Sequence, residues 1–389
     1  MLISMCSKLH ASPFSPRTQT KEASVIGKFR AASVIILGKA NMSQWGNSRS
    51  SPSTSSNGWS AVDGQTYGVY VHHQDPCGSS SGSTTAMALE LAAVTIGVET
   101  LIERTVGSIT CLAMRSNLRG SVGPITRTVK DAAMLLTVTA GHGSDNPATS
   151  NIPYDADKIP NYASSCKHDR LRGKRLGVPR NSLENPFAAD MNVTSMMKAF
   201  DNALEVMINA GATIIDNDAP QKIFGPTEYK FDMESYFRKL ARKADDFFSP
   251  RVVAAKERML YLGGPGGIDG PLDAARADAL VLPSVCSSDA PGLVGCPVIC
   301  VPLGFMTDDT RQFGAGGAGY SCDRFGISFI GRAFSDQGLI ELAFAFEQLM
   351  SHSGAQRKPI VLPTIDLPIL AGRHKWSAVW QGLMASVAW

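Results

Sequence analysis

The chain has 389 residues, of which 44% are hydrophobic and 18% are charged. This balance excludes a disordered chain, because it supplies enough apolar surface to offset the conformational entropy lost on folding. The 37 basic and 34 acidic residues leave a formal net charge of +3, which is too small to favour nucleic acid or an anionic membrane as a partner. No stretch approaches the roughly 18 apolar residues of a membrane span.

The N-terminal residues 1–21 contain no acidic residue but include Lys8, Arg17, Lys21 and several serines. They lack the apolar core of a secretory signal. We therefore expect an irregular leader over 1–21 and a cytoplasmic protein.

The eight cysteines do not predict a disulfide framework, which is typical of short secreted chains. Cys296 and Cys300 lie in an apolar run, where period-2 spacing would place both on one face of a strand together with Val298. No CxxC or HxxxH pair accompanies them, so we expect buried thiols and no zinc site.

The spacing of apolar residues indicates helices and strands in alternation. Residues 22–37 are predicted to form a helix followed by a short strand, and further helices are expected over 84–97, 126–140, 190–210 and from Ser335 to about Met350. Strands are expected from Thr213 and over 279–283, 296–303 and 325–330. A loop is expected at 39–41, and segments rich in serine, glycine or proline predict further loops at 43–60, 77–83 and 263–271. This alternation predicts one layered α/β domain.

The segment CGSSSGS at 77–83 precedes a predicted helix and is the first candidate for chemistry. A phosphate-binding loop would follow the pattern GxxxxGK[ST], and the lysine of that pattern is missing here. Residues 78–82 match the nucleophile-elbow pattern GxSxG, but no apolar strand precedes them. These residues alone leave an ordinary Gly/Ser loop open beside a catalytic one.

Short pieces of the sequence, taken in chain order, resemble the amidase-signature family of serine hydrolases, and among them the fungal-type amidases. The pieces are ILGKANMS at 36–43, NGWS at 57–60, GQT at 64–66, QDPCGSSSGS at 74–83, GSI at 107–109, VGPITRTVKD at 122–131, DALVLP at 278–283, PV at 297–298, VPLG at 301–304 and FGISF at 325–329. The resemblance implies an amidase-like α/β domain over 22–366, with a mixed central sheet flanked by helices. A C-terminal tail over 367–389 lies beyond it.

The resemblance also implies a Ser–Ser–Lys mechanism that cleaves a C–N bond without a metal or an organic cofactor. In this mechanism Ser108 is the nucleophile, and Ser79, held by a cis peptide bond, bridges it to a neutral lysine. Backbone N–H groups before the nucleophile stabilise the oxyanion. The binding residues implied are Thr105, Val106, Gly107 and, as the supporting neighbour of Ser79, Ser80. The implied partner is a small-molecule amide, and the oligomeric state is left open.

The sequence departs from the family pattern in three places. No Lys-Asp-Asn element precedes the serine loop: Lys8 lies near the place without that context, and Lys39 belongs to a different family element. The segment 101–106 lengthens the connection between Ser79 and Ser108, and the segment from Ser108 to the GPITRT run is short for the family. We therefore expect an incomplete fold, as in a truncated or degenerate amidase. A catalytically impaired amidase-like protein, with a binding function or none, is the alternative.

A different base is conceivable on residue types alone. His72 and His73 precede the serine loop with Asp75 close by, as a Ser–His–Asp arrangement would require. A metal site at the two histidines is no better supported, because adjacent strand residues face opposite ways and no third ligand is apparent.

Overall fold

The structure is a computed structural model, and it describes the greater part of the chain in separate ranges. These are residues 2–6, 23–43, 57–61, 63–70, 72, 74–100, 120–142, 149, 152–155, 158–180, 183, 194–217, 250, 254, 257, 261, 264–284, 287, 291, 295–305 and 324–350.

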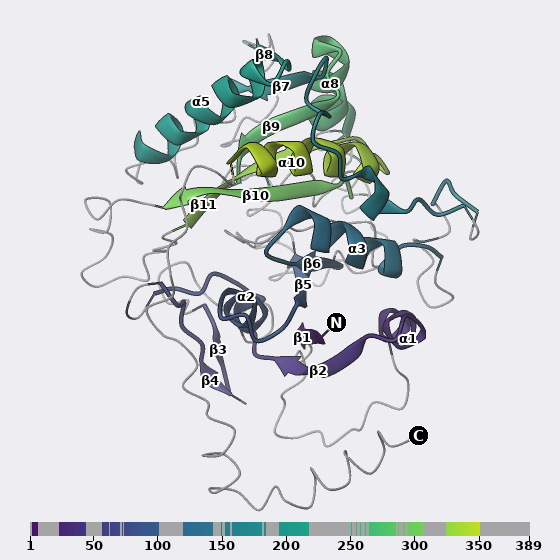
Figure 1. Ribbon diagram of the computed structural model, residues 1–389, viewed down its shortest axis with the longest axis vertical. Helices are drawn as coiled ribbons and strands as arrows, with labels where there is room; N and C mark the ends of the chain where they lie inside the picture. The colour runs from purple at the N-terminus through teal and green to yellow at the C-terminus, as the bar shows by residue number, and fades with distance from the viewer. Residues whose placement is uncertain are drawn as a thin grey trace, which may run out of the picture.

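A four-stranded sheet forms the N-terminal part of the described chain (Figure 1). Its strand order is β2 (Ile35–Ala40), β1 (Leu2–Cys6), β5 (Val94–Thr100) and β6 (Gly120–Ile125). The strands β2, β1 and β5 are parallel, and β6 is antiparallel to β5. A short antiparallel ribbon, β3 (Trp59–Ser60) with β4 (Gly64–Gln65), stands apart from this sheet.

The strand β1 differs from the irregular leader expected over 1–21. Its five residues LISMC pair with β2 on one side and with β5 on the other. The β2 strand is also longer than expected: it continues through Gly38, where it was expected to end, and takes in Lys39 and Ala40 of the expected loop. The pairing explains both differences, because the parallel register of β1 with β2 continues as far as Cys6 opposite Ala40.

A five-stranded mixed sheet forms the C-terminal part, in the order β10 (Val298–Phe305), β11 (Arg324–Ile330), β9 (Ala279–Pro283), β7 (Arg175–Pro179) and β8 (Thr213–Asn217). The strands β9, β7 and β8 are parallel, and β11 runs antiparallel to both β9 and β10. Together with the covering helices, the two sheets confirm the expected mixed α/β fold.

Helices cover both faces of this second sheet. In β9, Ala279 and Val281 face the main core, to which α5 (Thr194–Asn209) and α10 (Asp336–Met350) contribute. The alternate residues Leu280 and Leu282 pack on the other face, against α8 (Asp269–Ala275). Burial on both faces explains why the strand is a continuous apolar run with no polar alternation.

The helix α3 (Val129–Thr139) lies between the two sheets (Figure 1). Its residues Ala132 and Leu136 belong to the main core of the C-terminal part. Leu135, one residue away on the helix surface, packs instead with α1 (Ser24–Ala31) and β5 of the N-terminal part. This helix therefore makes apolar contacts with both halves.

Charged groups from both halves bind the ends of α3. At its N-terminus, Thr128 accepts a hydrogen bond from Asp131 N, and Glu347 of α10 accepts one from Val129 N at 2.9 Å. At its C-terminus, Lys28 Nζ of α1 donates to the carbonyls of Thr139, Ala140 and Gly141 at 2.9, 2.9 and 3.2 Å. An anion at the start and a cation at the end both complement the helix dipole.

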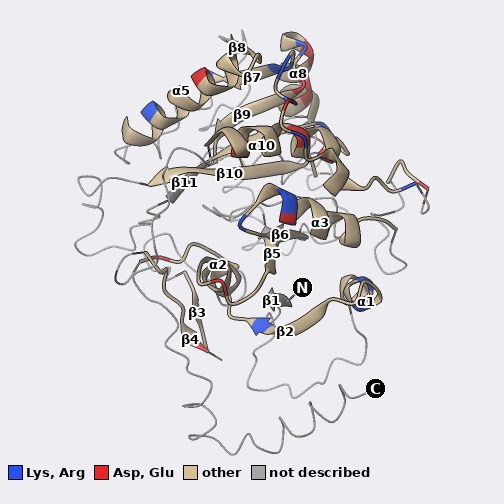
Figure 2. Cartoon of the chain, in the orientation of Figure 1, with Lys and Arg blue, Asp and Glu red and all other residues tan. Residues whose placement is uncertain are grey.

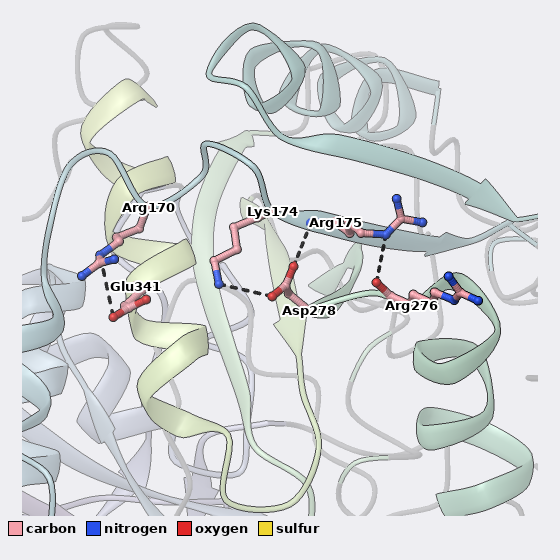
Figure 3. A network of polar contacts seen from close by, with 6 residues as sticks. All are labelled: Arg170, Lys174, Arg175, Arg276, Asp278 and Glu341. Atoms are coloured by element: carbon pink, nitrogen blue, oxygen red, sulfur yellow. Dashed lines mark hydrogen bonds and ion pairs between the residues drawn. The ribbon is translucent and has the colours of Figure 1, made fainter.

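Asp278, just before β9, joins β9 to β7 and lies in the polar network of Figure 3. Its carboxylate accepts from Arg175 N at 2.9 Å and from Lys174 Nζ at 3.2 Å. Arg175 in turn donates to the carbonyls of Ala275 and Arg276 at the end of α8. These contacts hold the N-terminal ends of the parallel strands β7 and β9 next to each other and next to the end of α8.

Basic and acidic positions are mixed around α8 and the neighbouring loops (Figure 2). Arg332, after β11, pairs with Asp269 at 3.1 Å and with Asp273 at 2.5 Å. Such exposed pairs contribute little to stability, so the two buried faces of the sheet carry most of it.

Two expected elements have different boundaries in the structure. The predicted helix 84–97 is a shorter helix, α2 (Ser81–Ala88), followed by the strand β5. The β-branched run Val94-Thr95-Ile96 fits a buried strand better than a helix. The described part of the loop expected at 263–271 is helical, with a π-helical turn (Gly264–Ile268) that leads into α8.

Asp336, the first residue of α10, is a buried carboxyl and gives a test of this packing. None of the described residues hydrogen-bonds to its Oδ1, and burial raises the pKa of this carboxyl to about 7. The native state therefore binds this proton more tightly than the unfolded chain does. The stability that this proton contributes is complete below the unfolded value and is lost as the pH rises through about 7.

We expect the Asp336→Asn variant to lose less stability than the wild type between about pH 4 and about pH 8. The difference should be on the order of a few kcal/mol in the free energy of unfolding, measured by denaturant titration at each pH. Glu347, whose pKa burial also raises to about 7, keeps its own contribution in both proteins. The exposed Asp155→Asn variant is the control, and parallel pH curves for Asp336→Asn and wild type would contradict the assignment.

Candidate functional site

The serine loop, residues 77–83, runs into the first turn of α2, and its serine side chains are buried. Ser79, Ser80, Ser81 and Ser83 are each at most 1% exposed. The Gly78–Ser79 peptide bond is cis, as the family resemblance implies, and Cys77 has a positive φ of 60°. The hydroxyl of Ser79 has no hydrogen-bond partner among the residues that the structure describes.

The end of β2 and the residues after it hold the serine loop through backbone contacts. Ser43 N donates to the carbonyl of Ser79, and Gly82 N donates to the carbonyl of Asn41, each at 2.9 Å. The hydroxyl of Ser43 lies 3.2 Å from that of Ser81. The peptide that carries Ser79 is therefore fixed by a segment almost forty residues earlier in the chain.

Asn41 is a hub between the serine loop and the β3–β4 ribbon. Its Nδ2 donates to Gly58 O, Gly64 O and Thr66 Oγ1 at 3.0 to 3.2 Å, and its Oδ1 accepts from Ser60 Oγ at 2.8 Å. Both the amide nitrogen and the amide oxygen of its side chain are engaged in this way. The ribbon is thereby tied to the segment that holds Ser79.

Ser80 and Ser83 connect the loop to β5. Ser80 Oγ accepts from Val98 N at 3.0 Å, and Ser83 Oγ donates to Ile96 O at 2.8 Å. On the same face of β5, Gly97 leaves room for the Ser80 hydroxyl, which would lie 3.2 Å from an added Cβ. Since β5 leads toward Ser108 in sequence, this strand is the connection between the two predicted catalytic serines.

Asp75 supports the loop from its N-terminal side. Its Oδ1 accepts from Cys77 N at 2.7 Å, and Asn57 Nδ2 donates to both of its carboxylate oxygens at 3.0 and 3.2 Å. Burial raises the pKa of Asp75, and the hydrogen bonds from Asn57 and Cys77 act in the opposite direction. The carboxylate is thus occupied by an amide and a backbone N–H.

The predicted site residues fall into two groups. The structure describes Ser79 and Ser80 and places both in the buried loop. Four others, the predicted nucleophile and its binding loop, lie outside the described residues: Ser108, Thr105, Val106 and Gly107.

Neither of the lysines described near the N-terminus, Lys28 and Lys39, hydrogen-bonds to Ser79 Oγ. Lys39 is exposed on the edge strand β2, and Lys28 donates to the end of α3, where burial lowers its pKa. Lys8 lies outside the described residues. His72 is exposed, and His73 is not described, so the Ser–His–Asp alternative gains no support. Within the described ranges, no group of three or more His, Cys, Asp or Glu side chains could hold a metal ion.

The structure also tests the two cysteines predicted to be buried thiols, and it shows residues around the serine loop that the sequence did not single out. Cys296 and Cys300 are both buried, as expected, and Cys300 Sγ lies 2.9 Å from Ser328 Oγ. The sequence-based expectations assign no role to Asn41 or Ser43, and they name Asp75 only in the Ser–His–Asp alternative. All three lie in the resembling pieces ILGKANMS and QDPCGSSSGS, which was the available signal.

A known protein family and several relatives match most of the chain. The Amidase family matches residues 5–101 and 103–259. A protein of Arthroderma benhamiae that carries the name amidase is 35% identical over 423 aligned residues, which cover 90% of this chain and 68% of the relative. A relative from Arabidopsis thaliana with the same name is 28% identical, covering 84% of this chain and 70% of its own length.

Solved structures of similar fold include peptide amidases. The native peptide amidase from Stenotrophomonas maltophilia has 26% identity and a TM-score of 0.69, with 92% of this chain and 83% of that chain covered. A peptide amidase bound to the competitive inhibitor chymostatin has 28% identity, the same TM-score, and coverage of 92% and 84%. None of the helices within the described ranges is long and apolar enough to cross a lipid bilayer.

The close approach of α2 to Asn41 predicts the effect of Gly82→Ala. A Cβ at Gly82 would lie 2.5 Å from Asn41 O and 2.6 Å from Asn41 N, so α2 or the Asn41 segment must move. We expect a loss of about 1–3 kcal/mol in the free energy of unfolding, measured by denaturant titration. The matched control is Gly27→Ala in α1, where nothing lies within 4 Å of the new Cβ. There we expect no loss, or a gain of up to about 1 kcal/mol, and equal losses at both sites would contradict the close approach.

Proposed function

We propose, since the chain belongs to the amidase family, that it hydrolyses the C–N bond of a small carboxamide through a serine acyl-enzyme. The family relation supports hydrolysis of an amide bond; the serine chemistry and the identity of the substrate are our proposal. The peptide amidases among the solved relatives make a peptide amide a suitable first substrate to test.

In this mechanism Ser108 Oγ attacks the carbonyl carbon of the amide, and its proton passes to Ser79 Oγ. Ser79 passes its own proton to a basic amine, in the manner of a relay. The N–H groups of 105–107 stabilise the oxyanion that forms. When the C–N bond breaks, the leaving nitrogen takes up the proton. Water then attacks the acyl-enzyme ester, which releases the carboxylic acid and restores the Ser108 hydroxyl.

The observation that supports this proposal most directly is the state of Ser79. Its hydroxyl is buried on a segment fixed by Ser43 and Ser80, yet none of the described residues accepts or donates a hydrogen bond to it. Leaving a buried hydroxyl unsatisfied costs about 1–3 kcal/mol. A proton relay requires a hydroxyl that is fixed in place and still free to bond to the nucleophile and to the base, and the hydroxyl of Ser79 meets both conditions among the described residues.

The same observation favours a second candidate function. If no amine lies beside Ser79 in the whole protein, the chain is an amidase-like protein with impaired catalysis. The described lysines Lys28 and Lys39 are engaged elsewhere or exposed, as reported above. A labelling experiment separates the two candidates.

We expect a fluorophosphonate probe to label the purified chain at one site and the Ser108→Ala variant not at all. The Ser79→Ala variant should label about 100- to 10,000-fold more slowly, because it lacks the relay that removes the proton. Labelling is quantified by intact-protein mass spectrometry over time. The control is Ser24→Ala on the exposed start of α1, which should label at the wild-type rate.

The outcome is read together with folding. A wild-type chain that unfolds cooperatively but is never labelled would overturn the serine hydrolase proposal and support the impaired protein. Labelling that persists in Ser108→Ala would show that a different serine is the nucleophile.

A further inference from the structure

We propose that Asp75 and Asn57 together form a positioning pair that holds Ser79 in place for the reaction. This inference rests on the proposed function and deepens it, because it names residues that act on Ser79 through the backbone and touch no substrate. The two residues are far apart in sequence, and the pair they form joins the β3–β4 ribbon to the serine loop.

The contacts of the pair are directional. Asp75 Oδ1 accepts from Cys77 N at 2.7 Å, which closes a turn two residues long ahead of Gly78. Asn57 Nδ2 reaches both carboxylate oxygens, at 3.0 and 3.2 Å, and so fixes the plane of the carboxylate. Hydrogen bonds to an ionised acceptor are about twice as strong as neutral ones.

The turn that Asp75 closes lies directly before Ser79. Cys77 has a left-handed backbone with φ of 60°, a conformation that disfavours residues with a Cβ and therefore needs contacts to hold it. The carbonyl of the same residue accepts from Ser81 Oγ at 2.6 Å. Besides its disulfide bond, Cys77 is thus held by Asp75 on its N–H and by Ser81 on its carbonyl, and Ser79 lies between Cys77 and Ser81 in the chain.

The partner Asn57 is itself held in place. Its backbone carbonyl accepts from Gln65 Nε2 at 2.6 Å, and the next residue, Gly58, donates from its N–H to Ser43 Oγ at 2.8 Å. Ser43 is also the residue whose N–H binds the Ser79 carbonyl. Two routes from the ribbon therefore converge on the peptide of Ser79, one through Asp75 and one through Ser43.

The pair can be reversed without changing its shape, which gives a sharp test. In Asp75→Asn the residue keeps an oxygen for Cys77 N, but its amide N–H groups face those of Asn57, so donors meet donors. In Asn57→Asp two carboxylates face each other. The double variant Asp75→Asn with Asn57→Asp restores one donor and one acceptor across the contact, with the polarity exchanged.

We expect either single variant to lower the rate of fluorophosphonate labelling about 10- to 100-fold, since a displacement of about 1 Å at a reacting group has that effect. The double variant should return to within a few-fold of the wild type. Hydrogen exchange measured by mass spectrometry should show faster exchange over residues 76–83 in the single variants alone. The α3 peptide 129–139 should exchange at the wild-type rate in both single variants, which separates a local loosening of the serine loop from a general loss of stability. The control is Asp155→Asn, whose ion pair with Lys158 is exposed.

The exchange measurement decides the inference even if the chain is never labelled. Faster exchange over 76–83 in the single variants, with recovery in the double variant, supports the pair whether or not the serine chemistry exists. Unchanged exchange over 76–83, equal loosening of α3, or a double variant no better than the singles would overturn it. Absence of labelling in the wild type counts against the proposed function alone.

Discussion

The backbone contact between the end of β2 and the start of α2 is the constraint on which the rest of the candidate site depends. Two reciprocal hydrogen bonds, Ser43 N to Ser79 O and Gly82 N to Asn41 O, are possible only because Gly82 has no Cβ to separate the two segments. This approach brings the hydroxyls of Ser43 and Ser81 within 3.2 Å and leaves Asn41 free to bind the β3–β4 ribbon through its side chain. The buried state of Ser79 is a consequence of this contact.

Much of the fold could be predicted from the sequence, since its signals are local. Residues 279–283 were predicted as a strand from their apolar run alone, and the helices at 126–140 and 336–350 were close to the observed α3 and α10. The predicted helix over 84–97 was wrong in its second half because spacing alone did not distinguish an apolar helix from a buried strand. The pairing of β5 between β1 and β6 settles the difference, and that pairing is a tertiary contact. The strand β1 within residues 1–21 was not predicted for the same reason, because its pairing with β2 and β5 is a tertiary contact.

The candidate site was predictable to a smaller extent. Ser79 and Ser80 followed from a resemblance, and the structure brings both into one buried loop. The roles of Asn41 and Asp75 could not be read from the sequence, because an asparagine or an aspartate in a polar stretch is equally suited to a turn. What distinguishes them is the partner each one finds, such as Asn57 for Asp75, and no periodicity in the chain encodes that distance. Ser108 stays a prediction.

The hydrogen bonds to the two ends of α3 have a consequence for the whole molecule. Lys28 comes from the first described helix and Glu347 from the last, and each binds one end of α3 where the helix dipole favours it. The helices α1 and α10, from opposite ends of the described chain, therefore both contact α3. A cut after α3 would leave Lys28 and α3 on one fragment and Glu347 on the other, so the hydrogen bond from Val129 N to Glu347 would form only when the two fragments associate.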